Sequence, residues 1–132
     1  NNRILPDNSE TMAILIQSFG FKHGLPADTD FMFDVRCLPN PHWEGHLRPY
    51  TGKDAPVIEY LESFPSVADM ENSILDFMRH WIPCFEKEGR SYMTVSIGCT
   101  GGQHRSVYLT QKIASELQKT RSNVSLRHRE CG

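Results

Sequence analysis

Residues 92–119 read YMTVSIGCTGGQHRSVYLTQKIASELQK, and this stretch decides the fold. Its first six residues are rich in β-branched side chains and predict a strand over Tyr92–Ile97. The glycine pair at 101–102 predicts a tight turn. A helix is expected from about His104 to Lys119, with a buried face made by Val107, Ile113, Ala114 and Leu117. Strand, glycine-rich turn and helix in this order indicate an α/β protein.

Three further strands and two helices are expected around this stretch. The strands are predicted at Thr11–Phe21, Phe31–Arg36 and Asn123–Arg129. A short helix should contain Val57 and Phe64, and a longer one should begin with a capping box at Ser66 and Asp69. The apolar face expected for the longer helix is Val67, Met70, Ile74, Phe77, Trp81 and Phe85. Pro83 should bend or end that helix.

The predicted architecture is one α/β domain, with a mixed, partly parallel sheet flanked by helices and a glycine-rich strand-loop-helix anion site. A chain of 132 residues suits one compact domain. Residues 1–10 read as a polar leader or linker, and residues 11–132 as the domain itself. Residues 38–56 hold too many prolines and glycines for a helix or central strand, so a long ordered loop or lid is expected there.

Composition excludes several classes of protein. No apolar run is long enough to span a membrane and no signal-peptide pattern is present, so a cytoplasmic protein without membrane contact is expected. The four cysteines lie far apart, which argues against a zinc ribbon or a disulfide framework. His42 and His46 lack the pattern of a zinc protease, and neither a metal nor a cofactor is expected.

The glycine-rich turn predicts an anion site. Several backbone amides and the amino terminus of the following helix can point at one phosphate group. Arg105 can bind phosphate through two N–H bonds, and Thr100, His104 and Ser106 add donors beside it. The chain contains no G-x-x-x-x-G-K-[ST] pattern, so nucleotide hydrolysis is not indicated. Lys22 and His23 follow the first predicted strand, and each alone is typical of an exposed turn. His23 and His42 are expected to converge with Arg105.

Two other interpretations of the turn stay open. Cys99, Arg105 and Ser106 have the C-x5-R-S spacing of cysteine-dependent phosphatases, in which a thiolate attacks phosphorus. Gly98 stands where those enzymes usually have His, and no acidic residue is placed by sequence alone. The turn could also be purely structural. A pure interaction module is a further hypothesis, since residues 103–132 carry six Lys or Arg against two acids in a chain of net charge −2.

Five motifs in order resemble the RapZ/YvcJ family of RNase adapter proteins. They are Ser18–Gly24, Asp34–Arg36 with Leu38–Pro41, Leu47–Pro49 with Thr51–Gly52, Ile97–Val107 and Arg127–Arg129. The resemblance covers about residues 11 to 130. It implies the carboxy-terminal domain of such an adapter, whose amino-terminal P-loop domain is absent from this chain.

The resemblance implies a regulatory adapter rather than an enzyme. Such a domain senses glucosamine-6-phosphate, binds small regulatory RNA, presents that RNA to a ribonuclease and self-assembles into a homo-oligomer. The ligand pocket would be lined by Lys22, His23, His42, Cys99, Thr100, Gly101, Gly102, His104 and Arg105, with no catalytic residue. RNA phosphates would contact Arg121, Arg127 and Arg129. Enterobacterial members continue into a basic tail, whereas this sequence stops at Gly132, so weaker RNA binding is expected.

Overall fold

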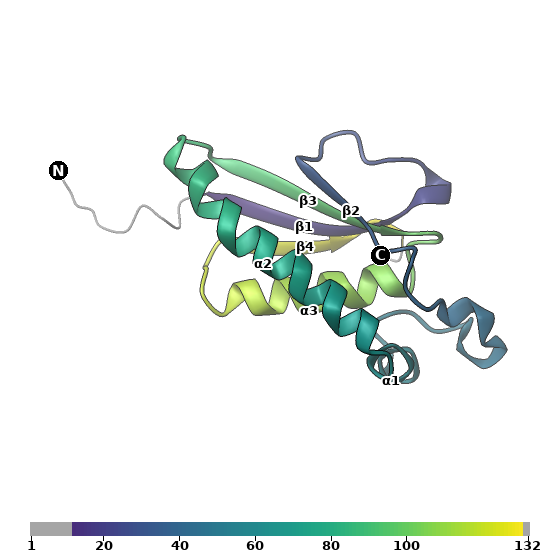
Figure 1. The fold of residues 1–132 in the computed structure, drawn as a ribbon. Coiled ribbons are helices and arrows are strands. Elements are labelled where there is room, and N and C mark those ends of the chain that lie inside the picture. Colours follow the sequence, from purple (N-terminus) through teal and green to yellow (C-terminus); the bar gives the residue numbers. More distant parts are fainter. Residues whose placement is uncertain (1–11, 131–132) are drawn as a thin grey trace.

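The computed structural model describes residues 12–130 and contains a four-stranded sheet of order β2-β3-β1-β4 (Figure 1). The predicted leader at residues 1–10 lies outside the described residues, as does Thr11. All three strand pairings are parallel, so the predicted α/β class is confirmed and the parallel character extends through the whole sheet. Parallel neighbours need crossover connections, which the intervening segments supply.

The four strands occur where the sequence predicts them, with shifted ends. They are β1 (Ala13–Gly20), β2 (Phe31–Asp34), β3 (Tyr92–Cys99) and β4 (Val124–His128). The central strand β3 continues past its predicted end because Gly98 and Cys99 still pair with Phe19 and Gly20 of β1. Tertiary pairing therefore carries the strand into the glycine-rich segment, where local propensity indicates a turn.

Helix α3 (Arg105–Gln118) is the helix expected after the turn, and its four predicted core residues are buried. Helix α1 (Ala55–Glu62) is the short helix, and α2 (Pro65–Lys87) is the long one. The predicted capping box is wrong, because α2 has Phe64 as its N-cap residue and Pro65 at its first position. Proline suits that position, since its fixed φ is helical and its missing amide would have no partner.

Helix α2 does not end at Pro83, which lies inside it. The last turns are held by packing, because the ring of Phe85 lies 5.6 Å from that of Phe31. The predicted face of α2 is confirmed except at Trp81, because Val67 and Ile74 are buried and Met70, Phe77 and Phe85 pack against the core. The fully buried residues extend to one side of that face. They are Val67, Ile74, Leu75, Met78 and Ile82, while Trp81 remains 44% exposed. Tertiary packing thus selects one edge of a broad apolar stripe.

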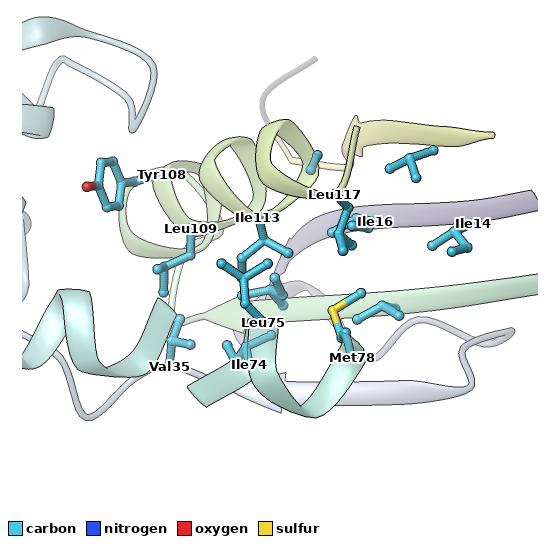
Figure 2. Packing of buried hydrophobic residues seen from close by; sticks show 14 of the residues in the cluster. Ile14, Ile16, Val35, Ile74, Leu75, Met78, Tyr108, Leu109, Ile113 and Leu117 are labelled. Carbon is cyan, nitrogen blue, oxygen red and sulfur yellow. The ribbon is translucent and has the colours of Figure 1, made fainter. Parts of the chain in front are cut away.

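The helices α2 and α3 lie side by side across one face of the sheet (Figure 1). Figure 2 shows how Ile14 and Ile16 of β1 face Met78, Ile113 and Leu117 from these helices. The residues that alternate with these along the strands face the other side of the sheet, which is polar. There Gln17 Nε2 donates to Ser96 Oγ at 3.0 Å. The segment between β1 and β2 crosses this second face, where Thr29 Oγ1 lies 2.8 Å from the same Ser96 oxygen.

Candidate functional site

Because the sheet is parallel, the carboxyl ends of its strands meet at one edge, where ligand sites of open α/β sheets usually form. Strand β1 ends beside β3, with Gly20 paired to Cys99. The loop after β3 leads into α3, and the 3-10 helix η2 (Phe21–His23) follows β1. A cavity of about 230 Å³ opens here, lined by Lys22, Asn40, His42, Arg48, Cys99, Thr100, Gly101, Gln103, His104 and Arg105.

The glycine-rich loop is fastened to the end of β1. Gly102 has a φ of +76°, and a Cβ atom on it would lie 2.6 Å from the backbone nitrogen of Gly20. The amide of Lys22 donates to the carbonyl of Thr100 at 3.2 Å. Gly102 therefore permits the close approach of two backbone segments and does not itself line the cavity.

Arg105 lies in the first turn of α3 and is only 4% exposed. Its Nη1 donates to the carbonyls of Arg36 at 2.7 Å and Leu38 at 3.0 Å, and its Nη2 donates to Thr100 Oγ1 at 3.4 Å. Nη1 thus holds the segment that follows β2, while Nε has no hydrogen-bond partner among the described residues. The guanidinium still adds a positive charge to the cavity wall.

His104 is the N-cap residue of α3, is 8% exposed and makes no side-chain capping bond. Its Nε2 has no hydrogen-bond partner within the described chain. Burial lowers the pKa of His104, nearby carbonyls of Tyr50 and Leu47 partly oppose this, and the charges of His42 and Arg105 lower it further. The lowered pKa favours the neutral imidazole near pH 7.

Cys99 is shared by the core and the cavity, with an exposed fraction of 2%. Its Sγ accepts a hydrogen bond from the amide of Gly102 at 3.3 Å and lies 3.1 Å from Ser106 Oγ. Burial alone raises the pKa of the Cys99 thiol, but the bonds to Ser106 and Gly102 and the charge of Arg105 lower it overall. The hydrogen bonds and the charge of Arg105 thus hold the pKa of the Cys99 thiol below its ordinary value despite burial.

The segment after β2 supplies the outer wall of the cavity. Asn40 accepts a bond from the amide of His42 at 3.0 Å and begins the 3-10 helix η3 (Pro41–Trp43). Arg48 Nε donates to the backbone carbonyl of His42 at 2.7 Å, and the two residues both line the cavity. Asn40, Arg48 and Gln103 were not among the predicted ligand residues. Asn40 and Arg48 lie in the proline-rich segment, and Gln103 lies in the glycine-rich loop. Only the structure shows that these two segments fold over the strand ends.

Of the nine predicted ligand residues, seven line the cavity and two do not. Gly102 lies behind the loop, and His23 is exposed on η2. His23 faces Glu130 instead: burial raises the pKa of Glu130, but the Gly20 amide, Arg129 and the charge of His23 lower it overall. His23 lies next to Lys22 in the chain, yet the tight 3-10 turn sends the two side chains to different surroundings.

The cavity is an electropositive site. Lys22, Arg48 and Arg105 bring permanent positive charges, and none of the residues lining the cavity is Asp or Glu. Within residues 12–130 no group of three or more His, Cys, Asp or Glu side chains is arranged to hold a metal ion. The amino end of α3 also points into this region and favours negative charge. The arrangement can bind a small anion, and it lacks a lining carboxylate that could protonate a leaving group.

The three arginines predicted for RNA lie in different surroundings. Arg121 follows α3 and is paired with Glu86 of α2. Arg129 donates to Glu130 at 2.7 Å and to the carbonyl of Gly24 at 2.6 Å, so it fastens the end of β4 to the segment after β1. Arg127 is exposed on the polar face of the sheet. The structure brings Arg127 and Arg129 together, because both line one surface hollow on the polar face of the sheet. Arg121 does not line that hollow and lies before the start of β4.

No helix among the described residues is long and apolar enough to cross a membrane.

Comparison with known proteins gives consistent matches. A family model described as the RapZ C-terminal domain matches residues 12–132. A nucleotide-binding protein from Thioalkalivibrio sulfidiphilus is 57% identical over 130 residues, which cover 98% of this chain and 46% of that protein. One from Methylococcus capsulatus is 58% identical over 119 residues, covering 90% and 40%. The chain therefore spans less than half the length of these curated relatives.

Proposed function

Because the chain belongs to the RapZ C-terminal domain family, we propose that its cavity binds the phosphate group of a small sugar phosphate such as glucosamine-6-phosphate. In this proposal the domain is the sensor of a cytoplasmic adapter that binds small regulatory RNA and presents it to a ribonuclease. It acts as part of a homo-oligomer and has no catalytic residue of its own.

The observation that carries the proposal is the cavity lining. Three permanent cations meet there without a carboxylate, beside the amino end of a fourteen-residue helix. Phosphate dianions are stabilised by such a setting, because backbone amides and the helix dipole add to the charge of the side chains. A sugar phosphate would place its phosphate against residues 100–105 and its hydroxyls near Asn40, His42 and His104.

The size of the cavity supports a small ligand. Its volume of about 230 Å³ is below the roughly 300–1,000 Å³ of pockets that bind drug-sized molecules. A monosaccharide phosphate is therefore a better candidate than a nucleotide for this site. The name of the curated relatives refers to nucleotide binding, but more than half of each relative's length lies beyond the matched region.

The RNA role is supported by family membership and by one exposed cation. Arg127 lies on the polar sheet face, and its side chain makes no ion pair or hydrogen bond with the residues that the structure describes. Arg129 is 22% exposed at its side chain and is already paired with Glu130, so it is a weaker candidate for contact with RNA phosphates. Arg121, bonded to Glu86, is weaker still for the same reason.

Lys22→Gln provides the sharpest test of the sugar-phosphate site. Lys22 is exposed and its side chain makes no hydrogen bond or ion pair with the described residues, so its amide replacement leaves the fold intact while removing one charge from the cavity. A hydrogen bond to a charged group contributes about 1.5–3 kcal/mol, so calorimetric titration with glucosamine-6-phosphate should show affinity weakened about 10- to 100-fold. Arg105→Ala is less clean, because it also leaves two backbone carbonyls without a donor.

The matched control is Lys119→Gln, because Lys119 is an exposed lysine at the opposite end of α3. Its affinity for glucosamine-6-phosphate should equal that of the wild type. Saturable binding that Lys22→Gln leaves unchanged would show that the ligand occupies another site. Absence of any binding to the wild type would remove the sugar-phosphate proposal altogether.

A cysteine-dependent phosphatase is the second candidate, favoured by the two hydrogen bonds at Cys99 Sγ. Against this alternative, Nη1 of Arg105 is bonded to backbone carbonyls, and no Asp or Glu lines the cavity to protonate a leaving group. Hydrolysis of an aryl phosphate that disappears in Cys99→Ser would establish the activity. An equal rate in both proteins would end this alternative.

A further inference from the structure

The polar face of the sheet carries a surface hollow that is separate from the anion cavity. Helices α2 and α3 cover one face of the sheet, and the segment between β1 and β2 crosses the other (Figure 1). The hollow has a volume of about 400 Å³, and its walls come from β1, β3, the end of β4 and residues 26–28. It shares no lining residue with the anion cavity. Parallel sheets usually have both faces covered, so a face that bears an open hollow is suited to contact with another molecule.

Arg127 gives this hollow a positive charge that the described residues do not neutralise. It is exposed on β4 beside Gln17 of β1, and its side chain makes no ion pair or hydrogen bond with those residues. Arg129 also lines the hollow, but Glu130 offsets its charge. The carboxylate of Asp28 is exposed and likewise has no partner in the described part of the chain. The hollow therefore suits a ligand that carries both an anion and hydrogen-bond donors.

Tyr92 adds an aromatic ring to the same hollow. It is the first residue of the interior strand β3 and is 54% exposed. Its side chain makes no ring contact or hydrogen bond with the residues that the structure describes. A single exposed aromatic residue is ordinary on a protein surface. Here, however, the ring lies in one hollow with an unpaired guanidinium, and these are the two groups with which proteins bind single-stranded nucleic acid.

The register of the sheet sets the spacing between the ring and the guanidinium. Tyr92 pairs with Ala13, and Arg127 pairs with Gln17, which lies four residues further along β1. At a rise of about 3.3 Å per residue, the two positions are about 13 Å apart along the strands. Stacked nucleotides of one strand rise by only about 3.4 Å each, so adjacent nucleotides of a stacked helix do not span this distance. A duplex also keeps its bases away from a protein ring, whereas an unpaired strand can extend and splay its bases out.

From these positions we propose that the hollow binds a short unpaired segment of RNA, with a base stacked on Tyr92 and a phosphate at Arg127. The carboxylate of Asp28 accepts a hydrogen bond from a ribose hydroxyl or a base amino group. This proposal rests on the RNA role proposed above and specifies where the RNA binds and in which form. An acidic peptide is a poorer occupant, because it would bring further negative charge to Asp28 and leave the ring of Tyr92 unused.

Fluorescence anisotropy with a labelled oligouridine of about 10 nucleotides tests the stacking contact, because single-strand sites usually take about 4–16 nucleotides. Tyr92→Ala removes the ring and should weaken the affinity about 5- to 100-fold. Tyr92→Phe keeps the ring and should bind like the wild type. The matched control is Trp81→Ala, because Trp81 is 44% exposed on α2, which covers the opposite face of the sheet. Its affinity should equal that of the wild type.

The salt dependence of the same binding tests the phosphate contact. Arg127→Gln removes one cation and should weaken the affinity for oligouridine. It should also reduce the slope of log affinity against log salt concentration by about 0.7, the value for one phosphate contact to a single strand. Lys119→Gln removes a charge from α3 on the opposite face and should leave this slope unchanged. Equal slopes in Arg127→Gln and the wild type would show that no phosphate lies at Arg127.

A blunt RNA duplex of the same length separates this inference from the proposed RNA role. Tyr92→Ala should leave duplex affinity unchanged, because paired bases do not reach the ring. Oligouridine binding that Tyr92→Ala does not weaken would overturn the inference, as would displacement by uridine monophosphate at the concentration at which unlabelled oligouridine displaces. Duplex binding without oligouridine binding would overturn the inference and retain the RNA role. If the wild type binds neither RNA, the RNA role and the inference both fail.

Discussion

Replacing Gly102 with alanine should damage both the stability of the domain and its anion cavity. Gly102 has a φ of +76°, which costs a residue with a Cβ atom roughly 1–2 kcal/mol. The new methyl group would also lie 2.6 Å from the Gly20 nitrogen and 2.8 Å from the Phe19 carbonyl carbon. These are backbone atoms of a central strand, so they cannot turn aside as a flexible side chain can.

The steric part of the cost can be separated by a control. Gly89 follows α2 with a φ of +87°, and a Cβ atom on it would meet nothing within 4 Å. Gly89→Ala should therefore lose only the conformational cost of roughly 1–2 kcal/mol. Overpacking in a close contact adds about 1–3 kcal/mol, so Gly102→Ala should lose about 2–5 kcal/mol in total.

Urea denaturation of both variants measures this difference. At a slope of about 2 kcal/mol/M, an extra loss of about 2 kcal/mol moves the unfolding midpoint by about 1 M. A second control is Glu130→Ala, because Glu130 Cγ would lie 2.5 Å from the new methyl group. The double variant should recover little stability, since the backbone contacts remain. Equal losses in Gly102→Ala and Gly89→Ala, or full recovery in the double variant, would refute the argument.

Two other predictions concern hydrogen-bonded side chains, one pair between strands β1 and β4 and one between helices α1 and α3. Burial, with a smaller contribution from Lys53, lowers the pKa of His128, whose Nδ1 lies 2.7 Å from Ser18 Oγ. The unfolded chain binds this proton more readily, so the stabilisation should be fully present above about pH 6.5 and be lost as the pH falls through the folded-state pKa. His128→Gln should make the urea unfolding midpoint less dependent on pH between about pH 7.5 and pH 5.5. A pH dependence equal to that of the wild type would contradict this cause. Tyr108 donates to Glu62 Oε2 at 2.9 Å, so Tyr108→Phe should lose about 1 kcal/mol in the same assay, and no loss would show that this bond does not stabilise the fold.

The sequence predicts the elements of this fold well because their signals are local. Apolar periodicity over residues 104–119 locates α3 and its buried face, and β-branched runs locate the strands. Signals that depend on neighbours were less reliable. Ser66 and Asp69 have the spacing of a capping box, but the helix begins at Pro65. Pro83 does not end the helix, because Phe85 packs on Phe31.

The site was predicted in part for the same reason. Residues 99–105 are contiguous in the chain, so their shared location could be inferred from one motif. Arg48 and Asn40 join them only because the segment after β2 folds back over the strand ends, held by the bond from Arg105 to Leu38. No local sequence pattern predicts which Lys or Arg residue of these loops will lie at the cavity. His23 shows the converse, since chain proximity to Lys22 did not bring it to the cavity.

By itself the sequence determined that this chain folds as an α/β domain with a glycine-rich loop between a strand and a helix. These properties follow from periodicity and backbone freedom, which act over a few residues. Only the tertiary structure decided that every strand pairing is parallel, that Arg105 is partly committed to backbone carbonyls and that Cys99 faces both core and cavity. These properties depend on contacts between segments far apart in the chain, because the partner of a buried polar group is chosen by packing and not by its neighbours in sequence.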